Sequence, residues 1–92
     1  MQLEFEWDDN KSDRNFKKHG VRFEEATTVF LDPNAVTLSD TLHSTEEDRY
    51  IEIGLSSRGR LLLVVYAERG SRIRIISSRL CTPREARFYD PS

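Results

Sequence analysis

Arginine residues near the end of the chain are the side chains best suited to do chemistry. The segment RGSRIRIISSR, residues 69–79, alternates arginines with apolar residues and leads into TPREARFY, residues 82–89. A guanidinium presents a planar fork of N–H donors that matches phosphate oxygens, and it stays protonated at any useful pH. This spacing indicates a surface that binds a phosphate-bearing partner, most simply RNA.

The charge of the chain is divided between its two halves. Residues 1–48 contain 12 acidic and 5 basic side chains, whereas residues 49–92 contain 4 acidic and 9 basic ones, all of them arginines. The overall net charge of −2 therefore combines a half near −7 with a half near +5. A basic half in a small protein supports the interpretation of a polyanionic partner.

Length and composition limit the class of protein. The 92 residues, 37% of them hydrophobic, predict one small domain over residues 1–92 with a modest stability margin. No stretch approaches the roughly 20 apolar residues of a membrane span, and the acidic N-terminus is unlike a secretory signal. The single cysteine, Cys81, and the distant pair His19 and His43 predict no disulfide, no metal site and no cofactor, which favours a cytoplasmic location.

Hydrophobic periodicity predicts an α+β fold in the order β-α-α-β-β-β-β-α, with a mostly antiparallel sheet flanked by helices. Alternation around Phe5 predicts the first strand, and a helix capped by Asp8 or Asp9 then runs to about Lys18. The connections between the last three strands are too short for a crossover helix, so these strands must be antiparallel neighbours. The other expected elements are a short helix through Phe30, strands at 35–40, 49–56, 61–68 and 72–79, and a final helix from Pro83.

The start of the final helix is the clearest boundary. Thr82 is the expected N-cap, Pro83 occupies the first helical position, and Glu85 stands where a capping box places a carboxylate. We therefore expect this helix to begin directly after the last strand.

Strand alternation predicts two different sheet faces, which a slip of one residue would exchange. The face expected to form the core under the first two helices carries Ile51, Ile53, Leu62, Val64, Tyr66, Ile73 and Ile75. The face expected to hold a ligand carries Tyr50, Glu52, Gly54, Arg72, Arg74 and Ser78 around Leu63, Val65 and Ile76. We expect Arg49 and Arg69 near Arg74, and Arg79 at the opposite end.

A series of motifs in a fixed order resembles a known family. The motifs are FEWD (5–8), KHGV (18–21), FEEA (23–26), VFLDP (29–33), EDRY (47–50), IGLSSRGRLLLVVY (53–66) and RIRIISSR (72–79). Each motif is weak alone, but their order and spacing together are specific. On these motifs the chain resembles the BrnT toxins of bacterial type II toxin–antitoxin modules.

The resemblance implies a RelE-like fold and a metal-independent endoribonuclease that cleaves mRNA and arrests translation. It also implies a ribbon-helix-helix antitoxin that neutralises the toxin. The two-partner complex would repress its own operon, so operator DNA would be contacted only through the antitoxin. Two positions depart from the family pattern, because Arg22 replaces a small polar residue that would cap the second helix, and Ser78 stands where alanine is common.

Cleavage of RNA without a metal uses the 2′-hydroxyl of the substrate as the nucleophile, so the protein must move protons and stabilise negative charge on the phosphate. Arg74 and Arg69 are the first candidates for charge stabilisation, followed by Arg49 and Arg79. The candidate bases are Glu47, Glu52 and His19. The candidate RNA-binding residues are Lys17, Lys18, Arg72, Arg84, Arg87, Tyr50 and Tyr89.

Structural roles compete with these assignments. Arg72 and Arg74 could only solvate the outer sheet face, Arg79 could pair with Glu85, and His19 could serve as a cation at a helix C-terminus. The alternative function is therefore a module that binds nucleic acid or protein through the same arginines without cleaving it, or an inactive family member.

Overall fold

The computed structural model describes residues 3–40 and 48–90, and its elements follow the expected order. They are β1 (Glu4–Glu6), α1 (Asp9–His19), α2 (Phe23–Thr28), the 3-10 turn η1 (Val29–Leu31), β2 (Val36–Ser39), β3 (Arg49–Leu55), β4 (Leu61–Arg69), β5 (Arg72–Leu80) and α3 (Pro83–Tyr89). The predicted order β-α-α-β-β-β-β-α is therefore confirmed. No helix in the described part of the chain is long and apolar enough to cross a bilayer.

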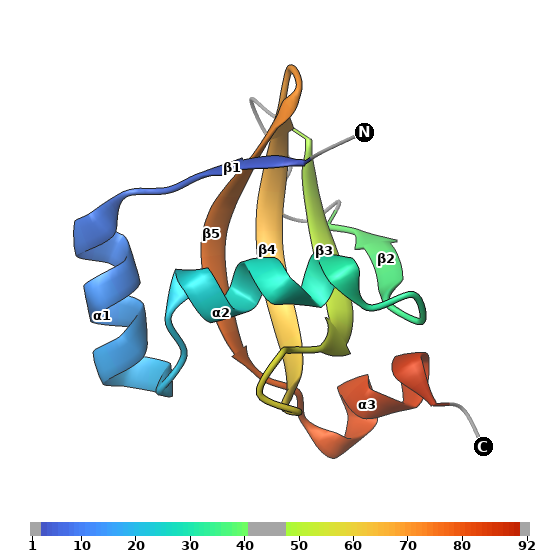
Figure 1. The fold of residues 1–92 in the computed structure, drawn as a ribbon. Helices are drawn as coiled ribbons and strands as arrows, with labels where there is room; N and C mark the ends of the chain where they lie inside the picture. Colours follow the sequence, from blue (N-terminus) through green and yellow to red (C-terminus); the bar gives the residue numbers. More distant parts are fainter. Residues whose placement is uncertain (1–2, 41–47, 91–92) are drawn as a thin grey trace.

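The five strands form one mixed sheet in the order β1-β5-β4-β3-β2 (Figure 1). The pairs β2–β3, β3–β4 and β4–β5 are antiparallel, whereas β1 runs parallel to β5. The expectation of a mostly antiparallel sheet is therefore corrected to a mixed sheet. No local pattern could give the direction of β1, because its partner lies at the far end of the sequence.

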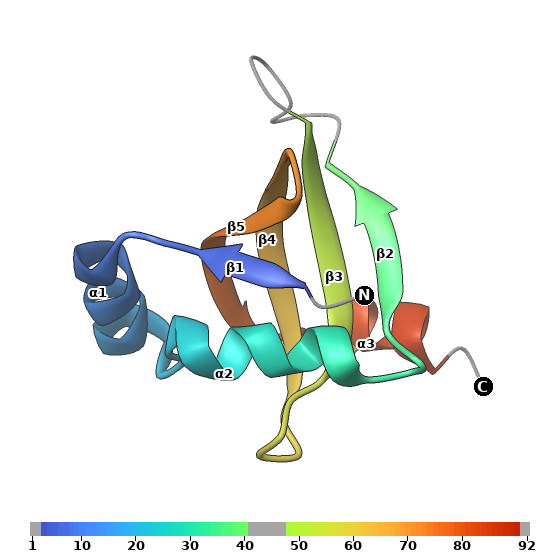
Figure 2. The ribbon, with the colours of Figure 1, turned by 45° about the horizontal axis from the view of Figure 1, so that its top comes forward.

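The helices are divided between the two faces of the sheet. In Figure 1, α2 crosses in front of β5, β4 and β3, while α1 lies beside β5; the turned view of Figure 2 places α3 behind the sheet. The core between α2 and the sheet contains Val21, Phe23, Ala26, Val29, Leu62, Val64, Tyr66, Ile73 and Ile75. Burial of a large apolar side chain contributes about 1.5–3 kcal/mol, so this layer dominates the stability of the fold.

The helices begin and end at residues with the usual capping preferences, except that the cap of α2 comes from a residue of α1. Asp8 accepts hydrogen bonds from the backbone of α1, and Gly20 ends that helix at φ 73°. The capping box of α3 is present, as predicted. Arg22 gives α2 no side-chain cap, but the hydroxyl of Ser12 accepts a 3.1 Å hydrogen bond from the Phe23 backbone N–H. A residue of α1 therefore replaces the missing cap.

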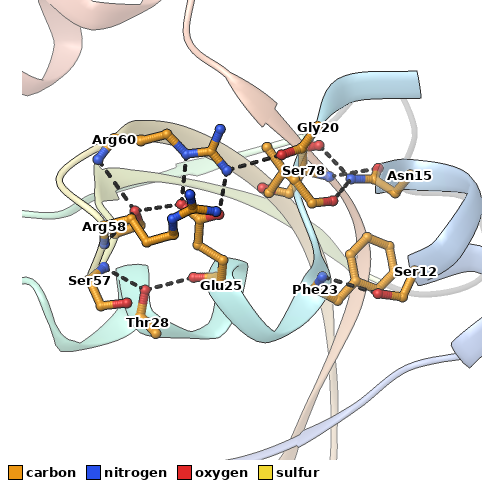
Figure 3. A network of polar contacts seen from close by, with 12 residues as sticks. Ser12, Asn15, Gly20, Phe23, Glu25, Thr28, Ser57, Arg58, Arg60 and Ser78 are labelled. Atoms are coloured by element: carbon orange, nitrogen blue, oxygen red, sulfur yellow. Dashed lines mark hydrogen bonds and ion pairs between the residues drawn. The ribbon is translucent and has the colours of Figure 1, made fainter. Parts of the chain in front are cut away.

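A polar network ties α2 to the β3–β4 turn (Figure 3). The buried carboxylate of Glu25 accepts hydrogen bonds from the Arg60 guanidinium, one of them 2.9 Å long, and from the Ser56 hydroxyl at 2.7 Å. Arg60 also donates to the Gly20 carbonyl at 3.0 Å. The hydrogen bond from Arg60 lowers the pKa of Glu25. The charged carboxylate therefore connects α2 to the β3–β4 turn.

The two predicted sheet faces are confirmed for β4 and wrong for β3. Leu62, Val64 and Tyr66 do lie in the core, but their cross-strand partners on β3 are Gly54, Glu52 and Tyr50. Ile51 and Ile53, which were expected on the core face, lie on the other face. The physical reason is the loop at 56–60, which places Leu55 opposite Leu61 and so sets which residues of β3 share a face with Leu62.

A β-bulge corrects a second face assignment. The register between β4 and β5 shifts between Val65 and Tyr66, so Tyr66 pairs with Ile75 whereas Val65 pairs with Ser77. Ile76 is the extra residue that this bulge adds to β5. Ser78, expected on the ligand face, is consequently fully buried on the core face opposite Val64.

Candidate functional site

The face of the sheet turned away from α2 carries most of the predicted arginines, and we call it the arginine face. Its members are Arg49, Arg69, Arg72, Arg74 and Arg79. Cross-strand partners project on the same face of a sheet. Arg49, Arg74 and Arg79 pair with residues on one face of β4, which also carries Arg69. Arg72 pairs directly with Arg69. The structure therefore places all four arginines predicted as catalytic on one face, with Arg49 and Arg69 near Arg74 and with Arg79 toward the opposite end of the sheet, as expected.

One row of cross-strand partners on the arginine face has an arginine on each side of a small residue. Arg49 is the cross-strand partner of Ala67, Ala67 of Arg74, and Arg74 of Glu6. Neighbouring strands lie about 4.8 Å apart, so Arg49 and Arg74 leave the sheet about 10 Å apart. Ala67 is fully buried between them, which leaves the space above it to the arginine side chains.

Beside this row lies a hollow of about 340 Å³. Its apolar floor consists of Ile51, Leu63, Val65 and Ile76. Its polar rim consists of Asp40, Arg49, Ser77, Arg79 and Glu85. An apolar hollow with a few convergent polar groups is the usual form of a ligand site.

Arg79 is fixed at the rim by a carboxylate of α3. Its two terminal nitrogens donate to the two carboxylate oxygens of Glu85 at 2.7 and 2.8 Å. These hydrogen bonds lower the pKa of Glu85 to about 2. Glu85 is therefore a poor proton acceptor, and its effect is to orient the Arg79 guanidinium.

The arginines near β1 make looser contacts. Arg69 and Arg74 approach the same Glu6 carboxylate at 3.7 and 4.0 Å, and Arg72 approaches Glu4 at 3.4 Å. Ion pairs at this distance and exposure contribute about 0–1 kcal/mol. A phosphate can displace such partners at little cost, so these arginines remain suited to binding an anion.

Three other candidates lie away from the arginine face or serve the fold. Glu52 is buried on the core face, where it accepts a 2.6 Å hydrogen bond from Thr37 and burial raises its pKa. Tyr50, also on the core face, stacks on Tyr66 with ring centroids 5.7 Å apart. Tyr89 donates a 2.7 Å hydrogen bond to Asp32, which anchors α3. The expectation that Glu52 and Tyr50 share the ligand face is corrected, because the loop at 56–60 sets the opposite register.

The remaining candidates are dispersed. Lys17 and Lys18 are exposed on α1 and His19 is its last residue, beside β5 and outside the hollow. Arg84 and Arg87 are exposed on α3. Glu47 lies outside the described residues.

Sequence reasoning missed Asp40 and Ser77 as rim residues, and it identified Glu85 only as a cap and as a partner of Arg79. A signal existed for Asp40, because it ends the predicted strand 35–40. The backbone N–H of Asp40 donates to the Arg49 carbonyl at 2.9 Å, which places it at the rim. Ser77 carried no local signal, because only the bulge turns it toward the hollow.

A second, larger hollow of about 500 Å³ lies between α3 and the ends of β3 and β4. Leu55, Leu61, Pro83 and Ala86 supply its apolar lining, and Arg87 is the one arginine in that lining. It offers little charge to a polyanion. The arginine face is therefore the better candidate for the functional site.

The fold and this site define an α+β protein with an arginine-lined hollow, a surface suited to phosphate groups. The sequence matches the family described as "Ribonuclease toxin, BrnT, of type II toxin-antitoxin system" over residues 7–85. Among solved structures, the 1.1 Å crystal structure of the Brucella abortus ribonuclease toxin BrnT aligns with a TM-score of 0.67 and 24% identity, covering 88% of this chain and 99% of that chain. No curated protein matches the sequence.

The chain belongs to the BrnT family of ribonuclease toxins. The resemblance inferred from the sequence motifs is thereby confirmed. Membership of a type II toxin–antitoxin family implies an RNA substrate and an antitoxin partner. The structural likeness supports the same α+β fold.

Proposed function

We propose that this protein is a metal-independent endoribonuclease that cleaves mRNA at the arginine face. The observation that carries the proposal is the hollow that Arg49 and Arg79 share, with Arg74 in the neighbouring row. Preorganised cations in a partly dry site stabilise the negative charge that develops on a phosphate during cleavage. Arg69 and Arg72 extend the same face toward the β4–β5 turn and would hold adjoining phosphates.

The proposed reaction needs only groups of the protein and of the substrate. The 2′-oxygen of the RNA forms a bond to phosphorus, the bond to the 5′-oxygen breaks, and the products carry a 2′,3′-cyclic phosphate and a 5′-hydroxyl. A carboxylate accepts the 2′-proton, and the departing oxygen takes a proton from water. The hydroxide that remains then removes the proton from the carboxylic acid, so that the net reaction moves one proton from the 2′-oxygen to the 5′-oxygen. We assign the base to Asp40, which borders the hollow, or to Glu47, and we assign the anionic oxygens to the arginines.

The partner follows from the family together with the charge of the site. We propose a ribbon-helix-helix antitoxin that covers the arginine face with an acidic segment and, bound to the toxin, represses the operon. The order of elements and the arginine-bearing sheet also support a RelE-like fold for this chain. Co-expression of the toxin and antitoxin genes, followed by co-purification, tests the pairing, and a toxin that stays alone at micromolar concentration would contradict it.

Cleavage is tested with purified protein and end-labelled RNA in the presence of EDTA. We expect fragments ending in 2′,3′-cyclic phosphate, lost in Arg49→Ala and Arg74→Ala. Arg58→Ala is the matched control, because Arg58 is exposed on the β3–β4 turn, away from the hollow. RNA that stays intact but shifts in a gel would instead support the non-catalytic binding module.

A further inference from the structure

The hollow has apolar lining residues as well as arginines, and these apolar residues have no role in stabilising the charge on a phosphate. Ile51, Leu63, Val65 and Ile76 form a floor that a phosphate would avoid. A nucleobase has flat faces that pack well on aliphatic side chains and an edge that forms hydrogen bonds. The volume of about 340 Å³ is at the lower end of the roughly 300–1,000 Å³ of small-ligand sites, which suits one nucleotide.

Ser77 supplies a hydrogen-bonding group within this hollow. It is half-buried, and its hydroxyl forms no hydrogen bond with any other residue in the described ranges. The bulge in β5 turns Ser77 and Ile76 toward the hollow together, while the next residue, Ser78, is buried on the opposite face. Bulges commonly re-aim a side chain next to a functional site.

We propose that this hollow accepts one unpaired nucleobase and that the Ser77 hydroxyl reads its edge, which makes Ser77 a specificity-determining residue and single-stranded RNA the substrate. This inference rests on the proposed function, because it places the base beside the phosphate held by Arg49 and Arg79. A base in a duplex is stacked and paired, and extracting it costs a few kcal/mol. Unpaired RNA avoids that cost, as in most sequence-specific RNA recognition.

The test measures binding, so that it does not depend on cleavage. The probes are short single-stranded RNAs that carry 2′-O-methyl groups, which remove the nucleophile, and that differ only in one central base. We expect the tightest and the weakest of the four to differ about 2- to 10-fold in Kd, as one net hydrogen bond of about 0.5–1.5 kcal/mol gives. Each probe annealed to its complement should bind at least about tenfold more weakly, because its base is no longer free.

Ser77→Ala should reduce the spread among the four probes to less than about twofold, because it removes the one hydroxyl that is expected to distinguish them. Ser78→Ala, the same substitution on the opposite face, should keep the wild-type spread. An unchanged spread in Ser77→Ala, or duplex probes that bind as tightly as single strands, would overturn the proposal. If the spread responds as expected while unmodified RNA stays uncut, the proposed cleavage fails and the base site stands.

Discussion

At the scale of single residues, the pair Arg79 and Glu85 shows how a charged group is held ready for a ligand. Two short hydrogen bonds fix the guanidinium in one orientation, and a fork held in this way loses little further freedom when it binds. Glu85 also accepts a 2.9 Å hydrogen bond from the Thr82 backbone N–H at the start of α3. One carboxylate therefore positions both a helix and an arginine of the rim.

Glu85→Gln is expected to lower the free energy of unfolding by about 1.5–3 kcal/mol at pH 7, because glutamine can keep the capping role but not the charged bonds to Arg79. The pKa of Glu85 falls from its ordinary 4.5 to about 2 on folding. The stabilisation is thus complete above about pH 5 and is lost as the pH falls toward 2. Urea unfolding of both proteins between pH 2 and 7 measures this difference.

A difference in unfolding free energy between wild type and Glu85→Gln that stays constant down to pH 2 would contradict this account of the pair. Arg84→Ala is a suitable control, because Arg84 is exposed on the same helix. Its unfolding free energy should stay within about 0.5 kcal/mol of wild type at every pH.

Ser78 is a buried polar residue without a partner for its side chain. The residue is fully buried, and its hydroxyl has no hydrogen-bond partner in the described part of the chain. A buried, unsatisfied hydroxyl costs about 1–3 kcal/mol. Ser78→Ala should therefore raise the free energy of unfolding by about 1 kcal/mol, and a urea titration that shows destabilisation would contradict this prediction.

At the scale of elements, polar side chains connect the helices to the sheet, either by hydrogen bonds to backbone groups or by an ion pair. The side-chain amide of Asn15 donates 2.8 Å hydrogen bonds to the carbonyls of Val21 and Ser78, and its oxygen accepts from the Ser78 N–H at 3.2 Å. Asn15 thus satisfies part of β5 that has no neighbouring strand. Glu25 makes the corresponding joint between α2 and the β3–β4 turn (Figure 3).

Glu25→Ala should destabilise the fold by about 3–5 kcal/mol, because it leaves the partly buried Arg60 guanidinium without its counter-charge. Glu24→Ala is the matched control, since Glu24 is the preceding residue and is exposed. It should change the free energy of unfolding by less than about 0.5 kcal/mol. Thermal and urea unfolding of the two variants measure the contrast, and equal losses would show that the network is not the joint described here.

The sequence predicted the elements that local chemistry determines and failed where a distant partner decides. The capping residues Asp8 and Thr82 located two helix starts, because a cap acts within one turn. The parallel direction of β1 and the cap that Ser12 gives to α2 depend on residues brought together only by folding. The bulge at Ile76 had no local signal, and it alone places Ser77 in the hollow.

The candidate site divides in the same way. The arginines were identified from residue type, and alternation along β5 placed Arg72 and Arg74 on one face. Arg79, expected at the opposite end of the sheet, shares that face only because of the bulge at Ile76. Glu52 was placed with them by a register error in β3, since one residue of shift moves a side chain to the other face. Residue type therefore predicted the chemistry, whereas the loop at 56–60 decided which carboxylates stand beside it.

At the scale of the whole molecule, five arginines of the second half of the chain gather on one face of the sheet, with carboxylates at its borders. The arginine face gathers cations from β3, β4 and β5, and the acidic residues Glu4 and Glu6 of β1 border it on one side. Charges grouped on one face produce a field that attracts a polyanion and orients it during approach. The net charge of −2 therefore understates how strongly this face should attract RNA.

Affinity for single-stranded RNA should consequently fall steeply with salt, because each phosphate bound by an arginine releases condensed counterions. The logarithm of the association constant is expected to fall linearly with the logarithm of salt concentration, with a slope of about −0.7 for each phosphate contact. Arg72→Ala and Arg74→Ala should each make the slope shallower by about 0.7, whereas Arg58→Ala, exposed on the β3–β4 turn, should leave it unchanged. Fluorescence anisotropy with 2′-O-methyl RNA between about 50 and 200 mM salt, a range over which phosphate contacts change affinity strongly, measures these slopes. Equal slopes for wild type and Arg74→Ala would mean that phosphates do not lie along this face.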